Sequence, residues 1–337
     1  MNTEEKYMKF KLVKEMLETP KIVADFKLEN TDKVIASIKE KNAIFFTGEG
    51  SSRIFPAKNA MMHSLRQGTD INLATEGGYQ AAEYDLSNFV VFGASNSGQT
   101  KEVIGLFDKL KKAENPDRFG LTANHDTKLE SLSAQTFVIS CGKEDAVAAT
   151  KSVAEQALFY QALMAKLKGK CFADKLSGLG DAIEAALTVD IDPAITSAIA
   201  NAGTIHFAGR NDGVAEELTL KTNEITRKKS DFLEGTYLVH GVEEVMNADD
   251  VVILIDPFES ELASIEKLIA QGVGMKVFAV STAKTIFPTI IVKDCGALTN
   301  YPYLAAGWNI LVEVGISLGI DLDKPERARK VGNEFVE

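Results

Sequence analysis

The chain has 337 residues, of which 45% are hydrophobic and 25% charged, and these fractions are ordinary for a globular protein. The formal net charge of −11, with no basic stripe to offset it, excludes a nucleic-acid-binding surface. No apolar run approaches the roughly 18 residues that a membrane helix needs, so no membrane association is expected.

Short apolar runs typical of strands alternate with helical patterns along most of the chain. A helical N-terminal arm is expected over about residues 1–40, and a long helix over about 147–167. The expected strands lie at 43–48, 71–75, 89–95, 119–123, 136–140, 204–209, 251–256, 276–281 and 289–293. Such alternation is the pattern of a parallel sheet with helices on both faces.

The alternation stops once, over about residues 169–200, where the pattern is continuously helical. We therefore expect two tandem α/β domains, 41–168 and 201–320, joined by a helical connector over 169–200. Each domain is expected to be a three-layer αβα unit with one parallel sheet. The arm, 1–40, precedes them, and a C-terminal tail, 321–337, follows.

The cysteines and histidines point to a reduced compartment and no metal. Cys141, Cys171 and Cys295 are an odd number without ligand-like spacing, which favours free thiols in the cytoplasm. The N-terminal stretch MNTEEKYMKF has no apolar segment, so no secretory signal is expected. None of the four histidines is paired at i+3 or i+4, so neither a zinc site nor another cofactor is expected.

Two turns rich in hydroxyl groups follow expected strands of the first domain. The first hydroxyl turn is TGEGSSR (47–53), and the second hydroxyl turn is SNSGQT (95–100). Each precedes an expected helix, whose N-terminal N–H groups and dipole favour an anion. In open α/β sheets ligands bind outside the carboxyl ends of the strands, so both turns are candidate anion sites.

The second hydroxyl turn has no lysine or arginine, and the P-loop pattern is absent, so a monophosphate suits the site better than a nucleoside triphosphate. Gly98 allows close approach of the backbone. For either turn alone, the alternative is that serine and threonine cap the following helix. Two such turns on adjacent strand ends favour a phosphate.

A carboxylate and an imidazole in the second half could move a proton on a sugar. Glu224 is expected on a helix, with its apolar neighbours directed mainly elsewhere, and His240 precedes Gly241 in a loop after a strand-like TYLV. Aldose–ketose interconversion needs a base at carbon and an acid–base group at oxygen. The alternatives are a solvated glutamate and a structural or exposed histidine.

These stretches resemble the double-SIS-domain sugar isomerase family, and in particular the isomerase half of glucosamine-6-phosphate synthase. The resemblance is carried by GEGSS (48–52), SNSGQT (95–100), GKEDAVAATKSVAEQAL (142–158), KTNEIT (221–226) and an HG pair sixteen residues after Glu224. It implies the SIS fold for both domains, a phosphosugar substrate, and a homodimer with active sites shared between subunits.

The resemblance also implies roles for individual residues. Phosphate binding falls on Ser51, Ser52, Ser95, Asn96, Ser97 and Thr100, and sugar binding on Glu144, Val147 and Lys221. Glu224 moves the C1–C2 proton, and His240, from the partner subunit, assists ring opening. Lys330 aligns with a tail lysine that forms a Schiff base; its alternative is a cation favoured by a helix dipole.

Three departures from the synthase surround the sugar's C2 substituent: Ala149 replaces a serine, Asn223 replaces a lysine, and LVHGV replaces LKHGP. We therefore expect a C1–C2 proton shift on a 6-phosphorylated amino sugar or ketosamine, foremost glucosamine-6-phosphate deamination with isomerisation. The alternatives are a fructosamine-6-phosphate deglycase of the fructoselysine type, a plain aldose–ketose phosphosugar isomerase, and a non-catalytic phosphosugar sensor.

Overall fold

The computed structural model describes residues 1–327 and 334–335. The chain divides into two compact units, each built on its own sheet. The first unit comprises Lys21–Asp145 and Ala149–Ser177, with residues 334–335 of the tail. The second unit comprises Met1–Pro20, Ala146–Ala148 and Gly178–Arg327.

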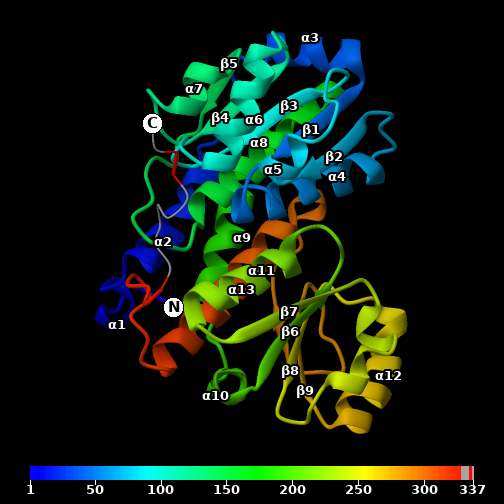
Figure 1. Cartoon of the computed structure of the whole chain (residues 1–337). Coiled ribbons are helices and arrows are strands. Elements are labelled where there is room, and N and C mark those ends of the chain that lie inside the picture. The colour runs from blue at the N-terminus through cyan, green and yellow to red at the C-terminus, as the bar shows by residue number, and fades with distance from the viewer. Residues whose placement is uncertain (328–333, 336–337) are drawn as a thin grey trace. The chain divides into compact units, whose positions relative to one another are not determined.

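The first unit contains a five-stranded parallel sheet in the order β2-β1-β3-β4-β5 (Figure 1). Its strands are β1 (Ala43–Thr47), β2 (Asn72–Glu76), β3 (Val90–Ala94), β4 (Arg118–Thr122) and β5 (Gln135–Val138). The order reverses at β1 and β3, because β2 pairs on one side of β1 and β3 on the other. This reversal makes the carboxyl ends of β1 and β3 the switch point of the sheet, where open α/β sheets bind ligands.

Helices cover both faces of this sheet. They are α4 (Ile54–Arg66), α5 (Gly78–Ala81), α6 (Lys101–Lys112), α7 (Lys128–Leu132) and α8 (Lys151–Leu167). Phe45 packs in an apolar cluster with Leu106 and Phe107 of α6, whereas the ring of Phe46 lies 4.5 Å from that of Tyr160 on α8. Successive strand residues face opposite sides, so each side has its own helices.

The second unit contains a parallel sheet of five strands in the order β10-β9-β8-β6-β7 (Figure 1). Its strands are β6 (Thr204–Gly209), β7 (Lys229–Glu234), β8 (Val251–Ile255), β9 (Lys276–Ser281) and β10 (Thr289–Ile291). All five residues of β8 are buried, as expected for a parallel strand covered on both faces. Its switch point lies between β6 and β8.

The helices of the second unit pack on this sheet and on one another. They are α10 (Pro193–Asn201), α11 (Val214–Thr226), α12 (Leu262–Ile265), a π-helical segment (Glu266–Val273) and α13 (Asn300–Ser317), with α9 (Leu176–Thr188) beginning at the edge of the unit. Val252 and Leu254 pack with Ile265 of α12 and Ile269 of the π-helical segment.

The N-terminal arm forms α1 (Glu5–Met8), α2 (Lys11–Ala24) and α3 (Asp32–Lys41).

The expectation of an α/β fold with parallel sheets flanked by helices is confirmed, but the account of residues 229–239 is wrong. KSDFLE forms edge strand β7, which was not predicted, and the strand-like TYLV instead contributes a 3₁₀ turn, Tyr237–Val239. The long helix begins at Lys151 rather than near 147. Within the described residues, no helix combines the length and apolar character needed to cross a membrane.

Candidate functional site

The two hydroxyl turns lie side by side at the carboxyl edge of the first sheet. β1 and β3 pair in parallel register, with Thr47 opposite Gly93, so both turns leave the same edge of the sheet. Gly48 is closely enclosed: a Cβ atom there would lie 2.9 Å from the carbonyl oxygen of Ser52 and 3.1 Å from that of Ala94. The two turns therefore lie next to each other at the switch point.

In the first hydroxyl turn, Gly50–Ser52 form a single 3₁₀ turn before α4. Ser51 is buried and Ser52 is half-buried. Glu49 accepts a hydrogen bond from the N–H of Gly78 at 2.7 Å. Partial burial of its carboxylate, with a contribution from Glu102, raises the pKa of Glu49 above its usual range.

The second hydroxyl turn is closed by its own hydrogen bonds. Ser95 and Thr100 pair through their hydroxyl oxygens at 2.7 Å, and the N–H of Gln99 donates to Ser97 Oγ at 3.2 Å. Gly98 has φ +65°, a left-handed conformation that favours glycine. Thr100 precedes α6 but makes no side-chain capping hydrogen bond. Its hydroxyl thus shapes the turn rather than capping the helix, which weakens the capping alternative.

Glu144 forms a buried hydrogen-bond centre behind this turn. One oxygen, Oε2, accepts from Asn96 Nδ2 at 3.0 Å and from the hydroxyl of Ser152. The other, Oε1, accepts from the N–H groups of Thr150 and Ser152 at 2.8 and 3.4 Å. The side chain is 1% exposed. Its carboxylate therefore joins the second hydroxyl turn to the N-terminus of α8, where a negative charge is favoured.

Two of the three expected sugar-binding residues lie in the second unit. Val147 is half-buried in the loop before α8. Lys221 is fully buried on α11, and its ammonium lies 2.6 Å from Glu224 Oε2 and 3.4 Å from Glu217 Oε1. Spacings of three and four residues place these groups on one helix face. Lys221 is thus directed at two carboxylates of its own helix.

The two expected proton-transfer groups occupy different settings in the second unit. Glu224 lies near the C-terminal end of α11, with its side chain 28% exposed. His240 is exposed directly after the 3₁₀ turn Tyr237–Val239, and its Nε2 lies 3.1 Å from Thr236 Oγ1. Among the described residues no hydrogen bond joins Glu224 to His240. The structure therefore does not assemble them into a proton-transfer pair within one chain.

Lys330 lies outside the described residues, but residues 334–335 of the same tail contact the second hydroxyl turn. Glu334 forms an antiparallel bridge with Thr100, and the N–H of Phe335 donates to the carbonyl of Gln99 at 2.9 Å. The ammonium of Lys128 lies 5.3 Å from the centre of the Phe335 ring, within range of a cation–π interaction. This part of the tail is thus held at the candidate phosphate site.

The switch point of the second sheet holds a charged cluster that sequence analysis missed. Arg210 follows β6 and Asp256 follows β8; Arg210 Nε lies 2.5 Å from Asp256 Oδ2. The guanidinium stacks 4.0 Å above the ring of Phe258, and the hydroxyl of Tyr303 donates to Asp256 Oδ1 at 3.2 Å. Burial, with the adjacent carboxylate, raises the pKa of Tyr303 to about 12.

A signal for this cluster was present in the sequence. Arg210 directly follows the strand sequence TIHFAG and Asp256 directly follows VVILI, so both fall on the carboxyl edge of the sheet. In the part of the chain that the structure describes, no group of His, Cys, Asp and Glu side chains could hold a metal ion.

Solved structures share this fold over nearly the whole chain. The C-terminal domain of glucosamine-fructose-6-phosphate aminotransferase from Francisella tularensis has a TM-score of 0.78 and 18% identity, covering 96% of this chain and 100% of that one. Tagatose-6-phosphate ketose/aldose isomerase from Escherichia coli has a TM-score of 0.78 and 16% identity, covering 97% and 100%. Glucosamine-6-phosphate deaminase from Thermotoga maritima has a TM-score of 0.71 and 21% identity, covering 97% and 99%.

At these identities the likeness establishes the α/β fold. The sequence itself matches no protein-family model and no curated protein. The roles of the individual site residues are therefore predictions.

Proposed function

We propose that the protein is a phosphosugar isomerase-type enzyme with tandem SIS domains. Its proposed substrate is a 6-phosphorylated amino sugar or ketosamine, foremost glucosamine 6-phosphate, which it deaminates and isomerises. The observation that carries the proposal is the pairing of two hydroxyl turns at the switch point of the first sheet. Three solved structures of the same fold act on, or take their names from, sugar 6-phosphates.

The phosphate is proposed to lie between the two hydroxyl turns. Its oxygens would accept hydrogen bonds from hydroxyl groups and from the N–H groups at the start of α6. The proposed ligands are Ser51, Ser52, Ser95, Asn96, Ser97 and Thr100. Because Ser95 and Thr100 already pair at 2.7 Å, their oxygens are held in place before a ligand arrives. Such preorganisation lowers the entropic cost of binding.

The proton shift is proposed to use Glu224 as the base at carbon. An aldose and its ketose share an enediol, so one carboxylate can remove the C2 proton and return it to C1. The ammonium of Lys221, at 2.6 Å, restricts the orientation of the Glu224 carboxylate. His240 is proposed to exchange protons with the ring oxygen during ring opening. Lys330 is proposed to form an imine with the open-chain ketose, since an imine withdraws electrons better than a carbonyl.

We further propose a homodimer with composite sites, which the exposure of His240 supports. The residue is exposed, and the apolar side chains of Tyr237 and Val245 on either side are 62% and 81% exposed. Exposed apolar groups around a catalytic candidate suit a subunit interface. Mixing a Glu224→Gln variant with a His240→Asn variant should restore activity to about a quarter of the wild type. Absence of any rescue would count against shared sites.

The activity is tested by supplying candidate substrates and measuring every product. With glucosamine 6-phosphate we expect equal amounts of fructose 6-phosphate and ammonia. Release of lysine from fructoselysine 6-phosphate, without deamination of glucosamine 6-phosphate, would instead establish a deglycase. Isomerisation without release of an amine would establish a plain isomerase. Binding without any turnover would leave a phosphosugar sensor and overturn the proposed enzyme.

A further inference from the structure

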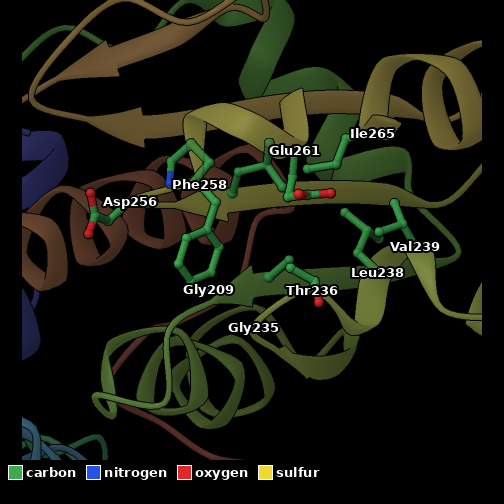
Figure 2. A pocket seen from close by; sticks show the side chains of 12 residues that line it. Gly209, Gly235, Thr236, Leu238, Val239, Asp256, Phe258, Glu261 and Ile265 are labelled. Atoms are coloured by element: carbon green, nitrogen blue, oxygen red, sulfur yellow. The ribbon is translucent and has the colours of Figure 1, made fainter. Parts of the chain in front are cut away.

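The crevice at the switch point of the second sheet supports the segment that leads to His240. It is lined by Gly209, Gly235, Thr236, Leu238, Val239, Asp256 and Phe258, among others, and Figure 2 shows where these residues lie around it. Its interior volume of about 20 Å³ accommodates about one water molecule. The ion pair of Arg210 with Asp256 lies at its edge. The protein's own side chains thus fill most of the crevice.

The backbone of the segment is fixed at several points before it reaches His240. The N–H of Gly235 donates to the carbonyl of Gly209, and that of Val239 to the carbonyl of Thr236. Leu238 is buried in the apolar cluster of the second unit. These contacts hold Thr236 in place, and Thr236 is the residue whose side chain meets the imidazole of His240.

We propose that Thr236 is a positioning residue for His240, a role that rests on the proposed function. Its Oγ1 lies 3.1 Å from Nε2 of the imidazole. With Nε2 engaged by this hydroxyl, Nδ1 is the ring nitrogen left to exchange a proton with substrate. The hydroxyl therefore selects both the orientation of the ring and the nitrogen that reacts.

A hydroxyl suits this position because ring opening needs histidine in two protonation states. When the imidazole is neutral with its proton on Nδ1, the hydroxyl of Thr236 donates to Nε2. When both nitrogens are protonated, or when Nδ1 of that imidazolium has passed its proton to the substrate, Nε2 keeps its own proton and donates to Oγ1. A hydroxyl can reverse its role by rotating about one bond. A carboxylate accepts only, and would hold a single tautomer.

The test compares three substitutions in the full-length enzyme. Thr236→Val keeps the shape of the side chain and removes the hydroxyl; we expect kcat to fall about tenfold, with KM within twofold of the wild type. Thr236→Ser retains the hydroxyl and should keep kcat within about threefold of the wild type. Thr188→Val, the same change at an exposed threonine of α9, is the control and should leave both constants unchanged.

A second readout reports the contact without any need for activity. In protein labelled with ¹⁵N-histidine, the ring-nitrogen shifts of His240 are assigned by comparison with His240→Asn. Thr236→Val should move these shifts, whereas Thr236→Ser and Thr188→Val should not. Unchanged shifts in Thr236→Val, or changed shifts with an unchanged kcat, would overturn the proposal. If no substrate turns over, the proposed function fails, and the shifts alone decide whether the contact exists.

Discussion

The side-chain amide of Asn96 donates to the carboxylate of Glu144 over 3.0 Å, inside a site where Glu144 is 1% exposed. This bond links the second hydroxyl turn to the first turn of α8, whose N–H groups share the same carboxylate. Glu144 was expected beside the sugar. Its hydrogen bond to Asn96 predicts that it also holds Asn96 in place.

Glu144→Gln should therefore weaken both the fold and ligand binding. A glutamine retains one acceptor oxygen but directs an NH₂ group at donors, leaving buried groups without partners. We expect a loss of about 2–3 kcal/mol in the free energy of unfolding, measured by urea denaturation. Affinity for glucosamine 6-phosphate should fall about tenfold. Glu83→Gln, on the exposed surface of the same unit, is the control, and an equal effect there would contradict the assignment.

Gly98→Ala should disrupt the second hydroxyl turn. The residue has φ +65°, and an added Cβ would lie 2.7 Å from Thr127 Cγ2. Left-handed strain and this clash should destabilise the protein by about 2–4 kcal/mol, measured by thermal unfolding. Gly105→Ala is the matched control: Gly105 lies within α6, and an added Cβ there meets nothing within 4 Å. It should stabilise by about 0.5–1 kcal/mol.

One phosphosugar should bind per chain, because among the described residues the paired hydroxyl turns lie at the switch point of the first sheet and not at that of the second. In the second sheet the equivalent edge is filled by Arg210, Asp256 and Phe258. Calorimetric titration of Glu224→Gln, which should bind without turnover, ought to give a stoichiometry of one. Adding Ser95→Ala should weaken binding at least tenfold, whereas Arg210→Gln should change it less than threefold. Two equivalent sites per chain would contradict the account.

Stability should decrease as the pH falls from 6.5 towards 4, partly because of His63. The imidazole is 3% exposed, and in the described part of the chain its Nε2 has no hydrogen-bond partner. Burial, with a contribution from Arg66, lowers the pKa of His63 to about 4. Its unfolded-state pKa is higher, so the unfolded chain binds the proton first, and acid favours unfolding.

The folded-state and unfolded-state pKa values of His63 differ by about 2.5. This difference limits the loss in the free energy of unfolding to about 3 kcal/mol. Urea denaturation of His63→Leu should show a smaller loss of stability between pH 6.5 and 4 than the wild type. His125→Gln, at an exposed histidine, should retain the wild-type slope. Parallel slopes for His63→Leu and the wild type would show that His63 titrates normally.

The fold was predictable from sequence wherever burial on both faces makes strands continuously apolar. VVILI and AIFF are such runs, and both are strands. KSDFLE was missed because β7 is an edge strand, whose exposed residues are Lys229, Asp231 and Glu234. TYLV has β-forming residues, yet Leu238 alone is buried and the segment forms a 3₁₀ turn. Local propensity cannot distinguish these cases, since tertiary packing decides them.

The candidate site was predictable to a similar extent. The hydroxyl turns could be placed together because parallel strands share a carboxyl edge. The burial of Glu144 and the pairing of Arg210 with Asp256, 46 positions later, could not be predicted. Both depend on contacts between segments far apart in sequence. The contact between Thr236 and His240 is local, but it exists only because the segment forms a 3₁₀ turn.

The most direct test of the central claim is proton NMR of glucosamine 6-phosphate incubated with the enzyme in D₂O. If Glu224 moves a proton between C1 and C2, the wild type should incorporate deuterium at one of these carbons as fructose 6-phosphate forms. Glu224→Gln should bind the sugar but leave both positions protonated. Deuterium exchange that persists in Glu224→Gln would contradict the account. So would an enzyme-dependent formation of fructose 6-phosphate that incorporates no solvent deuterium and whose rate is unchanged in Glu224→Gln.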